Sequence, residues 1–220
     1  QLGLGVKLPT GDYNYQDYFY KNDTTYSYGA VDQSIQPGDG GTGFTLELNG
    51  SVKLYKGLHA YANAYYMSNP RNTNGTLTTR GGTVSATALK YRTNVMSVAD
   101  QYALRGGVNY SLKRFVAGLG LRMEGIPSED LIGASDGFRR PGYTIGVEPN
   151  ISYSIGAVDV QLVVPFAIKR NRVQSDSDKR RTADTGTFVQ GDAAFADYSI
   201  NFGISYRFGA THHMSNMNQM

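Results

Sequence analysis

The stretch from Phe44 to Leu54, FTLELNGSVKL, constrains the fold of this chain more than any other. Apolar side chains occupy its even-numbered positions, with Gly50 as the exception, and polar or charged side chains occupy its odd-numbered positions. Successive side chains of a β-strand point to opposite faces, so this pattern predicts a strand with one apolar and one polar face. The stretch is also long enough for a bilayer, which a tilted strand crosses in ~9–11 residues.

The same alternation recurs along the rest of the chain. It predicts seven further strands, at 2–8, 58–67, 102–112, 115–124, 143–155, 158–168 and 198–208. The apolar face of 58–67 is the weakest, because alanines occupy much of it. Together with 44–54, these stretches predict eight strands and an all-β chain.

The connections between the predicted strands alternate in length. Short turns lie at 55–57, 113–114 and 156–157, and long polar loops occupy 12–43, 68–98, 126–141 and 170–193. Transmembrane barrels have short periplasmic turns and long extracellular loops, whereas a soluble sandwich or lipocalin-like barrel has no reason to sort its loops in this way. The sequence therefore predicts an antiparallel, up-and-down transmembrane β-barrel with eight strands visible. The alternative is a soluble β protein whose charges coat an exposed sheet face.

Bulk composition excludes several other classes. No run of 18 apolar residues exists, so a membrane-spanning helix is excluded. The absence of cysteine excludes a disulfide scaffold and a cysteine-based zinc site. A net charge of +3 with scattered basic residues argues against a nucleic-acid partner. The 17 tyrosines suit strands and the aromatic girdles of membrane interfaces.

The polar parity of the predicted strands carries charges of both signs. Charges on the wall of a barrel lumen can pair or stay hydrated, whereas the apolar parity must face lipid. We therefore predict that a lumen is lined by Glu47, Lys53, Arg105, Arg122, Glu124, Glu148, Asp159, Lys169, Asp197 and Arg207.

Three segments give the chain a resemblance to a known family. They read LGLGVKLPTGDY at 2–13, SIQPGDGGTGFTLELNGSVKL at 34–54 and SINFGISYRF at 199–208. They resemble the bacterial outer-membrane family known as "MetA-pathway of phenol degradation", whose members are also described as transporters. The resemblance implies an outer-membrane barrel that passes small, aromatic or hydrophobic compounds, and it supplies no catalytic residues.

Members of that family carry a signal peptide and further strands before the segment that corresponds to Lys7–Gly11. The resemblance therefore implies that the barrel domain, residues 1–209 here, is N-terminally shortened. The complete barrel would then have about twelve strands, a number that decides whether the lumen is filled by side chains or can hold a channel.

The first long loop is rich in tyrosine, at positions Tyr13, Tyr15, Tyr18, Tyr20, Tyr26 and Tyr28. Rings at this density can stack on a sugar or an aromatic ligand, or join a protein interface. They can equally form cross-strand pairs in a hairpin that extends above the membrane. The sequence leaves both interpretations open.

Residues 210–220 form a polar tail that offers soft metal ligands, at His212, His213, Met214, Met217 and Met220. Imidazole and thioether groups suit copper, so the tail is a candidate copper site. The alternative is a polar extension without a metal.

These patterns predict a channel or transporter-like protein of the bacterial outer membrane, in which small molecules diffuse past a polar lumen. We expect it to contact membrane lipid, a small-molecule solute and a protein partner at its loops, and to need no cofactor. The alternative function is a structural or partner-binding barrel that presents its tyrosine-rich loops. An enzyme with a site at the loop rim is a third hypothesis, but His59 has no evident catalytic partner and no GxSxG motif is present.

Overall fold

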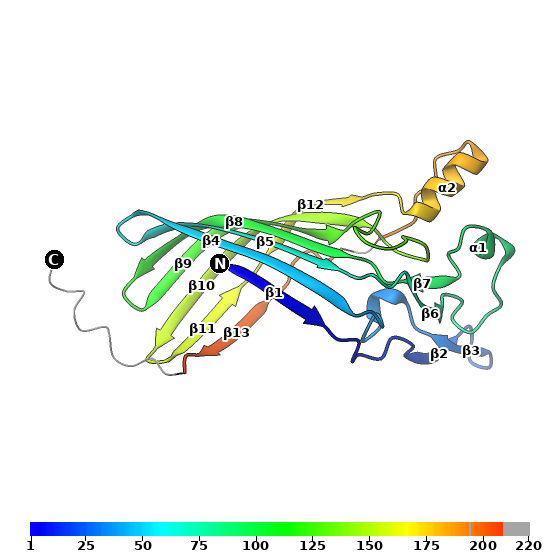
Figure 1. The fold of residues 1–220 in the computed structure, drawn as a ribbon. Coiled ribbons are helices and arrows are strands. Elements are labelled where there is room, and N and C mark those ends of the chain that lie inside the picture. The colour runs from blue at the N-terminus through cyan, green and yellow to red at the C-terminus, as the bar shows by residue number, and fades with distance from the viewer. Residues whose placement is uncertain (194, 209–220) are drawn as a thin grey trace.

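The structure is a computed structural model and describes residues 1–193 and 195–208. Its main element is an antiparallel sheet that curls into a half-barrel (Figure 1). The strands of this sheet are β1 (Leu2–Lys7), β4 (Gly43–Tyr55), β5 (Leu58–Ser68), β8 (Gln101–Leu112), β9 (Phe115–Ile126), β10 (Gly142–Ile155), β11 (Val158–Val163), β12 (Phe166–Arg172) and β13 (Asn201–Tyr206). From β1 to β11, each strand of this sheet pairs with the next one along the chain, and β11 then pairs with β13. Strand β12 pairs with β10, beside β11. The predicted antiparallel β fold is confirmed.

Smaller elements lie at one end of the sheet, to the right in Figure 1, while short turns lie at the other end. They are the hairpins β2 (Gln16–Tyr20) with β3 (Tyr26–Ala30) and β6 (Thr73–Leu77) with β7 (Val95–Ser97), and the helices η1 (Gln33–Ile35), α1 (Ala86–Lys90) and α2 (Asp176–Thr185). No helix in the described part of the chain is long and apolar enough to cross a membrane.

These elements correct the prediction that 12–43, 68–98 and 170–193 are plain polar loops. Helix α2 shows why the composition was misleading, because almost all of its side chains are polar. It is fixed at its ends: Ser175 and Asp178 form a reciprocal capping box, and Gly186 closes the helix in the left-handed conformation.

The two faces of the sheet are reversed with respect to a protein folded around an apolar core. Leu4 pairs with Leu46 on the convex face, and their side chains are 78% and 45% exposed. Polar residues of the opposite parity, such as Glu47, turn into the hollow of the curl. Alternation therefore places the apolar parity outside and the polar parity inside.

The predicted seventh strand, 158–168, is divided into β11 and β12. Val164 and Pro165 separate them, and a proline cannot donate a backbone hydrogen bond to a sheet. A register shift beside Ile145 then places Lys169 opposite Ile145 on β10. An extra residue at such a bulge changes which face the following side chains occupy.

The predicted eighth strand, 198–208, is also shorter than expected. Its regular part is β13, and Tyr198 makes only an isolated bridge to Phe166.

Well-buried apolar side chains gather where the strands meet the loops. Met96 and Val98 are 2% and 0% exposed, and Met67 at the end of β5 is 5% exposed. The loop end therefore has a packed interior of its own, which holds the hairpins and helices in place.

Close packing of β8 on β9 should make Gly107 intolerant of a side chain. A Cβ there would lie 2.5 Å from Cα of Gly120 and from the carbonyl oxygen of Leu119. We expect Gly107→Ala to lower the free energy of unfolding by about 1–3 kcal/mol, as overpacking does, in denaturant titrations followed by circular dichroism.

Gly50→Ala is the matched control, because nothing lies within 4 Å of a Cβ at Gly50 on the neighbouring strand pair. An equal loss of stability in both variants would contradict the close packing of β8 on β9.

Candidate functional site

A row of polar side chains crosses the concave face of the sheet. Asn49 on β4 lies opposite Asn63 on β5, and Asn63 lies opposite Arg105 on β8. Arg105 in turn lies opposite Arg122 on β9. Directly opposed residues of antiparallel strands point to the same face. These four side chains form a continuous band, called here the polar row.

Two arginines face each other within the polar row, and a carboxylate offsets their repulsion. Like charges directly opposite each other destabilise a strand pair. Oε2 of Glu148 on β10 lies 3.3 Å from Nη1 of Arg122 and 3.8 Å from Nε of Arg105. The Glu148 side chain is only 5% exposed, whereas those of Arg105 and Arg122 are 36% and 18% exposed. A carboxylate with little access to water therefore offsets the charge of two partly exposed guanidinium groups.

Arg122 also binds Glu124, which lies two residues further along β9 on the same face. Nε of Arg122 donates to Oε2 of Glu124 over 2.9 Å, and Nη2 donates to the same oxygen. Arg122 is therefore shared by two carboxylates from neighbouring strands.

Glu47 lies at the other end of the polar row, where amides hold it. Nδ2 of Asn49 and Nδ2 of Asn63 each donate to Oε1 of Glu47 over 3.0 Å. Asn63 also donates to Oδ1 of Asn49 over 2.7 Å. The hydrogen bonds fix the orientation of both amides.

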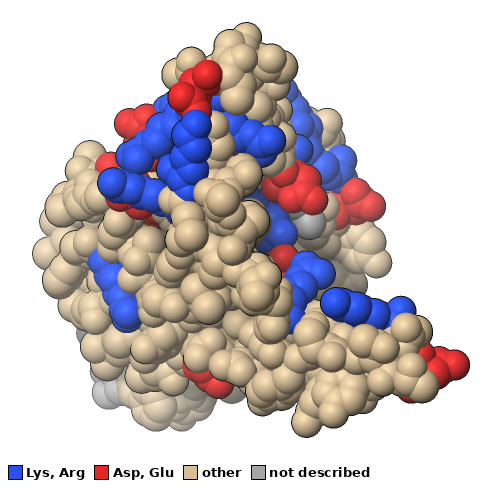
Figure 2. All heavy atoms as spheres, turned by 90° about the vertical axis from the view of Figure 1, so that its right-hand side faces the viewer, with Lys and Arg blue, Asp and Glu red and all other residues tan. Residues whose placement is uncertain are grey.

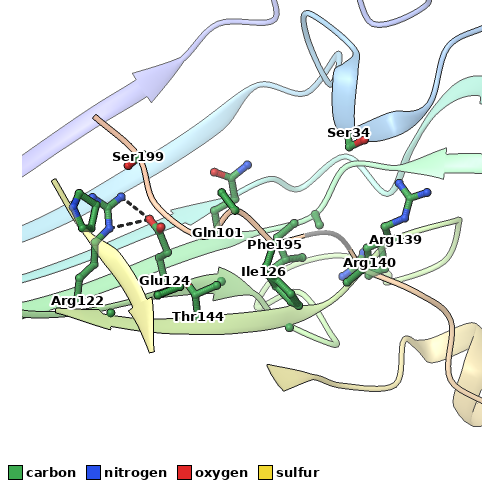
Figure 3. A pocket seen from close by; sticks show the side chains of 18 of the residues that line it. Ser34, Gln101, Arg122, Glu124, Ile126, Arg139, Arg140, Thr144, Phe195 and Ser199 are labelled. Carbon is green, nitrogen blue, oxygen red and sulfur yellow. Dashed lines mark hydrogen bonds and ion pairs between the residues drawn. The ribbon is translucent and has the colours of Figure 1, made fainter. Parts of the chain in front are cut away.

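Two hollows follow the concave face and meet at the Arg122–Glu124 pair. The hollow beside the loops, the mouth cavity, has a volume of about 440 Å³, and Figure 3 shows it between this pair and Arg139 and Arg140. The second hollow, the wall cavity, has a volume of about 880 Å³. The residues that line both are Gln101, Arg122, Glu124, Gly125 and Ile126. The cavities therefore adjoin each other along the sheet, with an ion pair at their junction, and the two together are called here the path.

Part of the predicted lumen set comes together around this path. The members that line the wall cavity are Glu47, Arg105, Arg122, Glu124 and Glu148. Asp197 lines the mouth cavity and forms an ion pair with Arg170, a residue that the sequence did not single out.

The other predicted lumen residues lie away from the two cavities. Asp159 and Arg207 pair with each other over 3.3 Å, next to the short turn after β10. Lys53 is exposed opposite His59 near a short turn. Lys169 lies opposite Ile145, on the convex side, because of the bulge in β12.

Uncharged lining residues were missed by the sequence reasoning. Tyr61, Asn63, Asn109 and Asn150 line the wall cavity beside the predicted charges. Their parity within the strands is the same as that of the charges, so the alternation could have identified them if neutral polar residues had been included.

The long loops meet at the carboxylate of Asp32. Arg140 donates to both of its oxygens, over 2.5 and 2.8 Å, and Arg80 lies 3.2 Å from Oδ2. Arg140 also lies 3.6 Å from Asp192. The Arg140 guanidinium holds the pKa of the Asp32 carboxyl well below its usual range. This cluster, the Asp32 junction, connects all of the long loops.

A buried ion pair lies next to the Asp32 junction. Arg139 and Asp130 have side chains 1% exposed and make a bidentate pair, with distances of 2.9 and 2.5 Å. Asp100 is 0% exposed and accepts hydrogen bonds from the backbone of Asn69 and Leu131 and from the Tyr66 hydroxyl. Breaking such a buried pair is strongly destabilising, so this network fixes the loop that carries Arg140.

Charged side chains of both signs gather over the upper part of the loop end (Figure 2). Lys90 of α1 pairs with Asp184 of α2, and Arg180 of α2 lies 3.0 Å from Asp136. Exposed pairs of this kind contribute little stability one by one. They join α1, α2 and the intervening loop into one surface.

The loop tyrosines separate into two groups. Tyr18 lies opposite Tyr28 and Tyr20 opposite Tyr26 in the β2–β3 hairpin, with all four rings on one exposed face. Their ring centroids lie 4.9–6.4 Å apart, as cross-strand aromatic pairs do.

Tyr13 and Tyr15 are not part of this face. The ring of Tyr13 lies under the guanidinium of Arg71 at 5.3 Å. The backbone of Tyr15 exchanges hydrogen bonds with the side chain of Gln36.

The predicted copper ligands lie outside the described residues, at His212, His213, Met214, Met217 and Met220. Within the part of the chain that the structure describes, no group of three or more His, Cys, Asp or Glu side chains is arranged to hold a metal ion.

Comparison with known proteins gives no relative: no family model, no curated protein and no solved structure matches the chain. The resemblance to the phenol-degradation family therefore stays a prediction.

The Asp32 junction makes the stability of the loop end depend on pH. The pKa of Asp32 is lowered in the folded state. The Asp32 carboxylate therefore contributes fully to the free energy of unfolding above its pKa in the unfolded chain, about 3.9, and this contribution is lost as the pH falls towards its pKa in the folded state. We expect wild type to be more stable than Asp32→Asn at pH 7 and pH 5, and this difference to shrink only below about pH 4, in denaturant titrations repeated across pH.

Asp23→Asn serves as the control, because Asp23 is exposed in the turn of the β2–β3 hairpin. Equal stability of wild type and Asp32→Asn at pH 7, or a difference that disappears already at pH 5, would contradict the role of the junction.

Proposed function

We propose that the chain forms the wall of a closed β-barrel in the bacterial outer membrane, and that its concave face lines a channel for small molecules. The observation that carries the proposal is the reversed sheet, with apolar side chains outside and an ion-paired polar surface inside. The chain would act without a catalytic step, by diffusion of solutes past a polar wall.

The convex face supports a lipid environment. Exposed apolar side chains cover this face from one side of the sheet to the other. Five examples that are 45–66% exposed are Leu46, Leu48, Leu119, Leu121 and Phe202. Soluble monomers rarely expose a continuous apolar surface of that extent. A bilayer would cover it. The strand ladder pairs the backbone groups inside the sheet, and closure of the barrel would pair the remaining edges of β1 and β13.

The concave face supports a water-filled path. Its two adjoining cavities share the Arg122–Glu124 pair in their lining, so a solute that moves from one cavity to the other along the sheet would pass beside this pair. Arg105 and Glu148 complete a charged cluster beside the path. Rings of charge at such points set the local field for permeating molecules.

Conductance is the direct test of the channel. Purified, folded protein in planar lipid bilayers should give stepwise ionic currents in salt solution. Folded, membrane-inserted protein that carries no current would contradict the channel and leave the fold intact.

The two faces of β4 should respond differently to substitution. Leu48→Asp places a carboxylate on the convex face and should impair insertion into lipid vesicles, at a cost of up to a few kcal/mol near the bilayer midplane. Glu47→Gln lies next to it on the concave face and keeps an oxygen that can accept from Asn63, so its insertion should match wild type. Equal insertion of the two variants would contradict the lipid-facing assignment.

A second candidate function is a partner-binding barrel, and the exposed tyrosine face of the β2–β3 hairpin favours it. Aromatic side chains are enriched at protein interfaces. This candidate differs from the channel in its expected result, because a partner-binding barrel would insert into bilayers without conducting.

A further inference from the structure

Neutral hydrogen-bonding side chains outnumber the charged ones in the lining of the wall cavity. Amides come from Asn49, Asn63, Asn109 and Asn150, and phenols come from Tyr61 and Tyr65. An amide can donate and accept, and so can a phenol. The lining therefore matches a solute whose own groups donate and accept at many positions.

Four of the five charged groups of the cavity are engaged with one another, and the fifth, Glu47, accepts hydrogen bonds from Asn49 and Asn63. Glu148 holds Arg105 and Arg122, and Arg122 also holds Glu124. An anion would have to displace a carboxylate from Arg105 or Arg122. A cation would have to displace an arginine from a carboxylate, or the two amides from Glu47. A neutral solute can use the remaining donor and acceptor positions without breaking a pair.

Two polar atoms of the cavity wall are left without a hydrogen-bond partner. They are Nε of Arg105, a donor that lies 3.8 Å from Glu148 and so beyond hydrogen-bond distance, and Oδ1 of Asn109, an acceptor. Both atoms are buried among the described residues. Buried polar atoms are normally satisfied by protein, water or ligand. A solute hydroxyl can satisfy either kind of atom once a small movement of the side chain turns the atom towards the cavity.

Tyr61 provides an aromatic surface beside these polar groups. Its ring lies over Gly107 and Gly120. A Cβ at Gly107 would lie 3.0 Å from a ring carbon of Tyr61, and a Cβ at Gly120 would lie 2.2 Å from its hydroxyl oxygen. The two glycines allow the ring to lie along the wall while it still lines the cavity. An aromatic surface with nearby hydrogen-bonding groups suits a molecule that has both C–H faces and hydroxyls.

We propose that the wall cavity binds neutral, polyhydroxylated solutes of mono- to disaccharide size and selects them over charged molecules. The volume of about 880 Å³ accommodates such molecules. This inference rests on the proposed function, because it requires that solutes enter the concave face. The wall cavity would decide which solutes pass, whereas the proposed function requires only that solutes pass.

Uptake into proteoliposomes tests the preference. Vesicles that contain the full chain would be given radiolabelled glucose, gluconate or glucosamine at pH 6, three molecules of similar size with no charge, negative charge and positive charge. We expect glucose to enter about fivefold faster than either charged molecule, the effect of about one net hydrogen bond. The glucose rate should also saturate with concentration, since a site is occupied.

A substitution tests the site itself. Asn109→Ala should reduce glucose entry severalfold, since one cavity amide is lost, and should leave gluconate entry unchanged. Asn14→Ala, in the first long loop, is the matched control and should behave as wild type. Circular dichroism of each variant would confirm that it is folded.

The possible results separate the two proposals. Equal rates for the three molecules, or a glucose rate that rises without saturation, would overturn the preference and leave the channel in place. Absence of uptake for all three, together with silent planar bilayers, would overturn both. An equal loss of glucose and gluconate entry in Asn109→Ala would overturn the assignment of the site.

Discussion

Alternation along the strands gives the sheet two faces that need different surroundings, and most other features of the molecule depend on this constraint. The convex face carries leucines, valines and aromatic residues that are largely exposed. The concave face carries the polar row, where Glu148 lies against both Arg105 and Arg122 and offsets the repulsion between them. An apolar phase outside and water inside would satisfy both faces at once. For this reason we propose a membrane barrel rather than a soluble sheet.

The loop end is built on a different principle. Here apolar side chains such as Val98 and the buried Arg139–Asp130 pair form an interior that resembles that of a soluble protein. The Asp32 junction connects the loops above this interior and places Arg140 at the mouth cavity. Order in the loops therefore determines the shape of the mouth cavity, while order in the sheet determines the polarity of the concave face.

The strand pattern could be predicted from the sequence because the period of two is strong in stretches such as Phe44–Leu54. The charged side chains that line the wall cavity could be predicted from the same alternation. The bulge that turns Lys169 outward could not be predicted, since one inserted residue reverses the faces without a signal in composition. Helix α2 was missed because its surface is polar on all sides, and its caps are local signals that hydropathy does not register. The ion pairs of the Asp32 junction join loops far apart in sequence, where no spacing rule applies.

The most direct test of the account is site-directed spin labelling along β4 in lipid bilayers. The chain has no cysteine, so each introduced cysteine carries the only label. We expect labels at Leu46, Leu48 and Val52 to be relaxed by oxygen dissolved in lipid. Labels at Glu47, Asn49 and Ser51 should instead be relaxed by a water-soluble nickel complex. Equal access of both reagents at all of these positions, or the opposite alternation, would contradict the assignment of the convex face to lipid and the concave face to water.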